Sequence, residues 1–60
     1  MKYLFWETEP NGDPTGKEKY LEAPTLRWAA QHMAYTLNGK LASIRTFVIM
    51  PDGKMWFGER

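Results

Sequence analysis

One histidine and two closely spaced glutamates are the residues in this sequence best suited to acid–base chemistry. His32 has no aspartate or glutamate three or four positions away, so a helix would bring no carboxylate to orient its imidazole. Glu7 and Glu9 share one side of an extended segment, where a solvated strand edge explains them better than a paired site does. We therefore expect no catalytic residues and predict that the chain is not an enzyme.

Phosphate-binding and metal-binding patterns also fail. The stretch "GDPTGK" (residues 12–17) resembles a phosphate loop, but three residues instead of four separate its glycines. Glu18 then stands where a serine or threonine would bind magnesium. The chain has no cysteine and a single histidine, which excludes disulfides, thiolate zinc sites and histidine-rich metal sites. We expect no metal and no cofactor.

Residues 24–39, "PTLRWAAQHMAYTLNG", predict one helix. Thr25 suits the N-cap, because its hydroxyl can accept a hydrogen bond from a backbone N–H of the first turn. Asn38-Gly39 should end the helix, with Gly39 in the left-handed conformation. Apolar residues recur at helical spacing and should pack on a sheet: Leu26, Ala29, Ala30, Met33, Ala34 and Leu37.

A second stripe lies on the opposite side of this predicted helix. Trp28, His32 and Tyr35 follow the spacing i, i+4, i+7, with Gln31 beside them and Arg27 at the border. Tryptophan, tyrosine and arginine are enriched among the residues that dominate binding energy at protein interfaces. Two interpretations stay open. The stripe binds a partner, or the helix rolls or the N-terminal loop folds over Trp28.

The remaining segments predict strands and turns. Strands are expected at residues 2–9, 18–23, 41–50 and 54–59, with a loop rich in proline and glycine at residues 10–17. The segment 18–23 is short and the weakest of these. The fold class is therefore α+β, with one helix packed on an antiparallel sheet of three or four strands. We expect residues 1–60 to form a single domain.

Asp52-Gly53 predicts a two-residue turn between the last two strands. In that register Ile49 faces Trp56, and Val48 faces Phe57. Alternation along the strands then places Ile44, Val48, Met50, Met55 and Phe57 under the helix. The uncovered face carries Arg45, Phe47, Ile49, Lys54 and Trp56, joined by either Tyr3 and Phe5 or Leu4 and Trp6 from the first strand.

Four interpretations of this aromatic and basic face stay open. It packs on a second copy of the chain, it is partly covered by the N-terminal segment, it binds another protein, or it stacks on the bases of a nucleic acid. The net charge of +1 excludes an acidic DNA mimic and gives no bulk attraction to nucleic acid. Residues 24–60 are more basic, with five basic and two acidic side chains. The sequence has no apolar run of the roughly 20 residues that a membrane helix needs and no signal-peptide pattern, so we expect a cytoplasmic protein.

The stretches "EAPTL" (residues 22–26) and "DGKMW" (residues 52–56) support a resemblance to small phage-encoded anti-CRISPR proteins, especially a type I-F inhibitor family. Those proteins enter their long helix through a similar stretch and end in a similar strand pair. Their helix carries a basic residue midway, where this one has Gln31 and His32. The resemblance implies a protein that binds a host CRISPR surveillance complex and blocks it sterically.

A second stretch, "DPTGKEKYLEA" (residues 13–23), is similar to the arm-type DNA-binding domain of phage integrases, which reads DNA with a small sheet. Both resemblances imply a mobile genetic element in a bacterial host. We predict a non-enzymatic inhibitor of a host protein complex, with a nucleic-acid-binding module or a structural homodimer as alternatives. The predicted partner-binding residues are Arg27, Trp28, Gln31, His32, Tyr35, Arg45, Phe47, Lys54 and Trp56.

Overall fold

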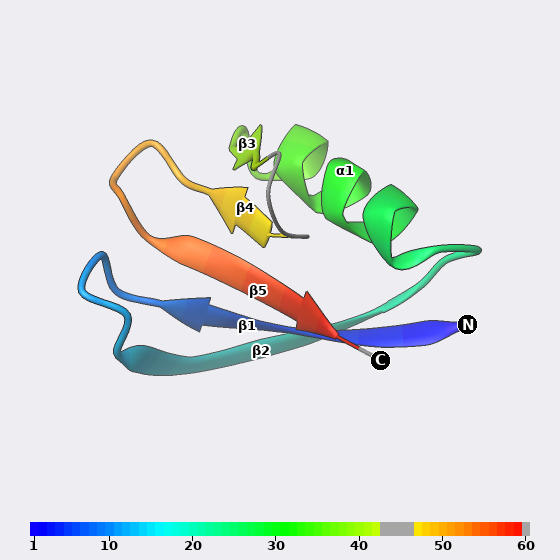
Figure 1. Ribbon diagram of the computed structural model, residues 1–60, viewed down its shortest axis with the longest axis horizontal. Coiled ribbons are helices and arrows are strands. Elements are labelled where there is room, and N and C mark those ends of the chain that lie inside the picture. Colours follow the sequence, from blue (N-terminus) through cyan, green and yellow to red (C-terminus); the bar gives the residue numbers. More distant parts are fainter. Residues whose placement is uncertain (43–46, 60) are drawn as a thin grey trace.

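The computed structural model describes residues 1–42 and 47–59. One helix packs on one face of a five-stranded antiparallel sheet (Figure 1). The elements are β1 (Lys2–Thr8), β2 (Pro14–Glu22), α1 (Leu26–Thr36), β3 (Lys40–Leu41), β4 (Phe47–Ile49) and β5 (Met55–Glu59). Strands lie across the sheet in the order β2-β1-β5-β4-β3. The predicted α+β fold is confirmed, with five strands instead of three or four.

A long hairpin of β1 and β2 forms one side of the sheet. The predicted loop at residues 10–17 is too long, because β2 begins at Pro14. A tight turn closes the hairpin: the N–H of Glu9 donates to the carbonyl of Asp13 at 2.7 Å, and that of Gly12 to the carbonyl of Glu9 at 2.8 Å. The pairing shifts register within the hairpin, near Gly16, whose φ of 91° suits only glycine well.

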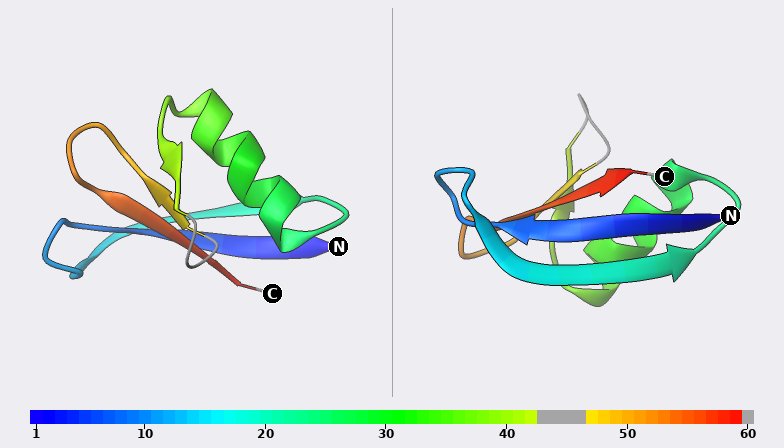
Figure 2. Two further views of the ribbon diagram at one scale, coloured as in Figure 1. Left: turned by 45° about the horizontal axis from the view of Figure 1, so that its top comes forward. Right: turned by 90° about the horizontal axis from the view of Figure 1, so that it is seen from below.

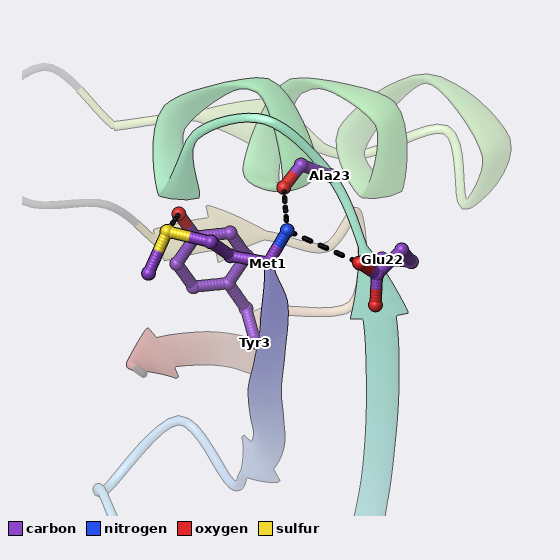
Figure 3. Close-up of polar contacts among 4 residues, drawn as sticks. All are labelled: Met1, Tyr3, Glu22 and Ala23. Carbon is purple, nitrogen blue, oxygen red and sulfur yellow. Dashed lines mark hydrogen bonds and ion pairs between the residues drawn. The ribbon is translucent and has the colours of Figure 1, made fainter.

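The first residue of the chain ties the open end of this hairpin to the start of the helix (Figure 3). The amino group of Met1 donates to the carbonyl of Ala23 at 2.9 Å and lies 3.1 Å from Oε1 of Glu22. The hydroxyl of Tyr3 donates to the sulfur of Met1 at 3.6 Å. These contacts hold the entry to α1 over β1, where the Tyr3 ring is buried.

Helix α1 begins as predicted. The Thr25 hydroxyl accepts a hydrogen bond from the N–H of Trp28 at 3.0 Å, which confirms the N-cap. The apolar stripe is also confirmed. Its residues pack against the sheet, with Ala29, Ala30, Met33 and Ala34 buried and Leu26 and Leu37 partly buried.

The end of α1 differs from the prediction in one residue. Asn38 takes the left-handed conformation, with φ of 58°, and the N–H of Gly39 donates to the carbonyl of Ala34 at 2.8 Å. Gly39 serves another purpose. A Cβ at this position would lie 2.6 Å from Cγ1 of Val48 and 2.9 Å from the carbonyl oxygen of Ile49. Glycine is therefore required for close approach to β4, and not for a positive φ.

The predicted strand at residues 41–50 is wrong as a single element. Its ends form two strands that pair with each other, with Lys40 opposite Ile49 and Leu41 opposite Val48. The next turn also differs from the prediction. Met50, not Pro51, pairs with Lys54, since the N–H of Met50 donates to the carbonyl of Lys54 at 2.7 Å. Proline has no N–H to make this bond, so the loop lengthens to residues 51–53.

This longer loop shifts the β4–β5 register by one residue. Val48 now pairs with Trp56, and Ile49 with Met55. A one-residue shift exchanges the two faces of a strand, so the expected exposure of Trp56 is wrong: the side chain is 7% exposed. The core under α1 comprises Tyr3, Phe5, Ala23, Ala29, Ala30, Met33, Ala34, Val48 and Trp56.

Met55 and Phe57, expected beneath the helix, instead belong to the opposite face of the sheet. Val48 lies under the helix as predicted, and Met50 packs partly buried against the core. Ile44, predicted to share that face, lies outside the described residues. Within residues 1–42 and 47–59, no helix has the length and apolar character needed to span a bilayer.

Candidate partner-binding surfaces

The outer side of α1 carries the first candidate site, here called the helix surface. It comprises the five predicted residues Arg27, Trp28, Gln31, His32 and Tyr35, and all five are exposed. The side chains of Trp28 and Tyr35 are 48% and 88% exposed. The interpretation that a rolled helix or the N-terminal loop covers Trp28 is therefore wrong for the described part of the chain.

Two aromatic rings of the helix surface stack on each other. Trp28 and His32 stack with centroids 5.3 Å apart and an angle of 7° between the ring planes. The helical i, i+4 spacing brings the rings together, and the N-cap at Thr25 holds the first turn that carries Trp28. Paired aromatic rings give a large apolar contact area at low entropic cost, with ring nitrogens at their edges for hydrogen bonds.

The helix surface is almost uncharged. Arg27 is the sole residue among Lys, Arg, Asp and Glu in the stretch "LRWAAQHMAYT" that forms α1. One positive charge contributes little to binding a nucleic acid, because that affinity depends on how many phosphates the protein neutralises and how many counterions are thereby released. An aromatic surface with a single arginine at its border is instead typical of the centre of a protein–protein interface.

The predicted partner-binding residues of the sheet do not form one surface in the described part of the chain. Trp56 is buried beneath α1, and Lys54 is half-buried next to the turn before β5. Arg45 lies outside the described residues. Phe47 begins β4, but its side chain is also outside them. The basic and aromatic face proposed from the two-residue turn depended on a register that the chain does not adopt.

The sheet has an uncovered face nevertheless, formed by other residues and here called the open face. Figure 2 (right) looks onto this side, with α1 behind the sheet. Trp6 and Phe57 stack across β1 and β5 with centroids 6.0 Å apart and ring planes at 26°. Among the described side chains, the registers place six large ones on this face: Leu4, Trp6, Tyr20, Ile49, Met55 and Phe57.

Sequence reasoning left Leu4 and Trp6 as one of two options and missed Tyr20, Met55 and Phe57. The signal that places Met55 and Phe57 is Pro51, because a residue without an N–H cannot make both hydrogen bonds of a two-residue hairpin. Applying that constraint to "MPDGK" (residues 50–54) shifts the pairing by one and moves Met55 and Phe57 to the open face.

The charged residues of the open face lie on its edge strands or at strand ends, and they include the exposed Lys40 of β3 opposite Ile49. Glu18 and Tyr20 belong to the edge strand β2, and the ammonium of Lys2 lies 5.4 Å from the centre of the Tyr20 ring. Glu22 contacts the amino group of Met1. Glu59 is the last residue of β5.

The two glutamates considered for acid–base chemistry have different surroundings. Glu7 is 6% exposed, so the expected solvated edge is wrong for this residue. Its Oε1 accepts a hydrogen bond from the Thr15 hydroxyl at 2.7 Å. The register shift in β2 brings Thr15 to this position, and the pair joins the two strands of the hairpin. Glu9 is half-buried.

No cluster of three or more histidine, aspartate or glutamate residues suited to a metal occurs in the part of the chain that the structure describes. No protein-family model, curated protein or solved structure matches this chain.

Proposed function

We propose that this chain is a non-enzymatic binding protein that captures a protein partner through the helix surface. The observation that carries the proposal is the stacked Trp28–His32 pair with Tyr35 almost fully exposed beside it. Exposed aromatic residues are common singly, but three on one helical stripe form a patch of the kind that marks an interaction site.

The partner we propose is a CRISPR surveillance complex in the cytoplasm of a bacterial host, with the chain acting as a phage-derived steric inhibitor. The resemblance of "EAPTL" and "DGKMW" to type I-F anti-CRISPR proteins supports this choice. Both stretches lie at the ends of secondary-structure elements. The first contains Thr25, the N-cap of α1, and the second begins in the turn before β5. A small, nearly uncharged aromatic surface suits occlusion of a protein site.

The test is binding of the chain to a purified type I-F surveillance complex, followed by target-DNA binding by that complex. Trp28→Ala should weaken binding by roughly thirtyfold, the effect of removing an interface residue worth about 2 kcal/mol. Tyr35→Ala should act in the same direction. Inhibition of DNA binding should fall in parallel, because a steric inhibitor acts only while bound.

Glu18→Ala on β2 serves as a matched control, since this exposed residue lies far from α1 on the edge of the sheet. It should leave capture unchanged. Capture that is equally strong for Trp28→Ala and wild type, with circular dichroism unchanged, would show that the helix surface is not the binding site. No binding of the wild-type chain to the complex would exclude this partner.

The nucleic-acid alternative makes a different prediction. Affinity for an oligonucleotide should then appear at low salt and fall steeply as salt is raised. Absence of oligonucleotide binding at low salt would exclude that alternative and leave the protein-binding proposal in place.

A further inference from the structure

The open face has the composition of an interface core. Its six large apolar or aromatic side chains span β2, β1, β5 and β4, with the stacked pair Trp6–Phe57 near the middle. No described element packs on this side (Figure 2, right). Tyr20 and Ile49 are 60% and 40% exposed. Aromatic residues surrounded by a charged margin are typical of protein interfaces.

The core on the other face is small. Among the described residues, four of the nine buried hydrophobic residues are alanines, and the largest fully buried side chains are those of Phe5, Met33 and Val48. A chain of 60 residues without cysteines has a thin margin of stability, and association is one common way to increase it. Covering the open face would add a second apolar layer.

The charges at the margin do not require a partner of opposite sign. Glu22 already contacts the amino group of Met1 at 3.1 Å. The ammonium of Lys2 lies over the Tyr20 ring. Glu18 is on an edge strand, and Glu59 is at the end of β5. These side chains can form a polar rim around a packed apolar centre, which suits a second identical surface.

The dimensions are sufficient for a dimer. The molecule measures 30 by 20 by 20 Å. Counted with its charged rim, the sheet side therefore offers at most about 600 Å² per copy, and two such sides would bury up to about 1,200 Å², the lower limit of stable interfaces. Two twisted sheets pack well face to face at a separation of about 10 Å.

We propose that the open face binds the open face of a second copy, forming a two-fold dimer with the two sheets in the middle. Both helices then lie on the outside, and the two helix surfaces point in opposite directions. The dimer is therefore bivalent: it carries two partner sites, one on each side. Dimerisation itself does not depend on the partner proposed above.

Sedimentation of the wild-type chain tests this proposal. The expected mass is twice that of the 7.0 kDa chain, or an average that rises towards that value with concentration. Trp6→Lys places a charge in the centre of the face and should raise the dimer dissociation constant by about thirtyfold or more. Ile49→Lys is a second variant at a more exposed position, and it should act in the same direction if Trp6→Lys fails to fold.

Tyr35→Lys is the matched control, because it introduces the same charge on the helix surface. This variant should sediment like the wild type. A wild-type chain that sediments as a monomer up to about 1 mM, where even weak complexes form, would overturn the proposal. Equal loss of the dimer in Tyr35→Lys and Ile49→Lys would also overturn it. Partner capture that survives in Ile49→Lys would separate the two proposals.

Discussion

Neighbouring aromatic residues in this chain have opposite environments. Phe5 and Trp56 lie under α1, at 0% and 7% exposure. Trp6 and Phe57, one position further along each strand, stack on the open face. Both faces of the sheet thus carry large aromatic residues, and the register of the β4–β5 hairpin decides which side Trp56 and Phe57 occupy.

The faces differ in how closely their residues pack. Phe5 lies opposite Gly58, and a Cβ at Gly58 would lie 2.4 Å from the Phe5 ring. The covered face therefore has no room for even one more methyl group here. On the open face, by comparison, Trp6 and Phe57 meet at 6.0 Å between centroids and keep part of their surface accessible. The first face is a packed core, and the second is partly accessible to solvent.

The largest effect is expected from removing the buried tryptophan. Trp56→Ala should lower the free energy of unfolding by about 3–5 kcal/mol, the usual cost of deleting a large core side chain. For a chain of this size that is most of the stability, so the variant should be largely unfolded. Trp28→Ala should change the free energy of unfolding by about 0.5 kcal/mol or less. Urea unfolding followed by circular dichroism measures both, and similar losses would contradict the assigned register.

Gly58→Ala should have an intermediate effect. The added methyl group would overlap the fully buried Phe5 ring and should lower the free energy of unfolding by about 1–3 kcal/mol. Glu59→Ala, one position along β5 and exposed, is the control and should cost little. A neutral Gly58→Ala would mean that the covered face is not tightly packed at Phe5.

The smallest of these effects concerns the helix that covers the face. Thr25→Ala removes the acceptor for the Trp28 N–H and should cost about 1 kcal/mol, whereas Thr25→Ser should retain most of the stability. Thermal unfolding of the two variants measures the difference. Equal stability of the alanine and serine variants would show that this hydrogen bond contributes nothing to holding α1 on the sheet.

Local patterns in the sequence predicted much of the fold. The helix, its Thr25 cap and its buried stripe depend on residues close in sequence, and all three were predicted correctly. The second stripe was placed correctly on the opposite side of the helix, but whether it is covered was left open. The β4–β5 register was not, because the Asp52-Gly53 signal was read without the missing N–H of Pro51. That one residue moved Trp56 into the core and removed the predicted basic face.

Other features depend on contacts between distant segments. The pairing of β3 with β4 and the need for glycine at positions 39 and 58 arise only when strands and helix meet. The burial of Glu7 requires the register shift that places Thr15 beside it. A periodic pattern of apolar residues contains no information about such approaches.

The three tryptophans allow the most direct test, because each lies in a different environment: Trp28 on the helix surface, Trp6 on the open face and Trp56 in the core. The chain can be labelled with 5-fluorotryptophan and its fluorine spectrum recorded with a soluble paramagnetic agent at low and high protein concentration. We expect the Trp28 signal to broaden at both concentrations and the Trp56 signal at neither. The Trp6 signal should be shielded in the dimer and should broaden in the Ile49→Lys variant. A Trp6 signal that broadens like that of Trp28 in the wild type at every concentration would show that the open face is not covered by a second copy.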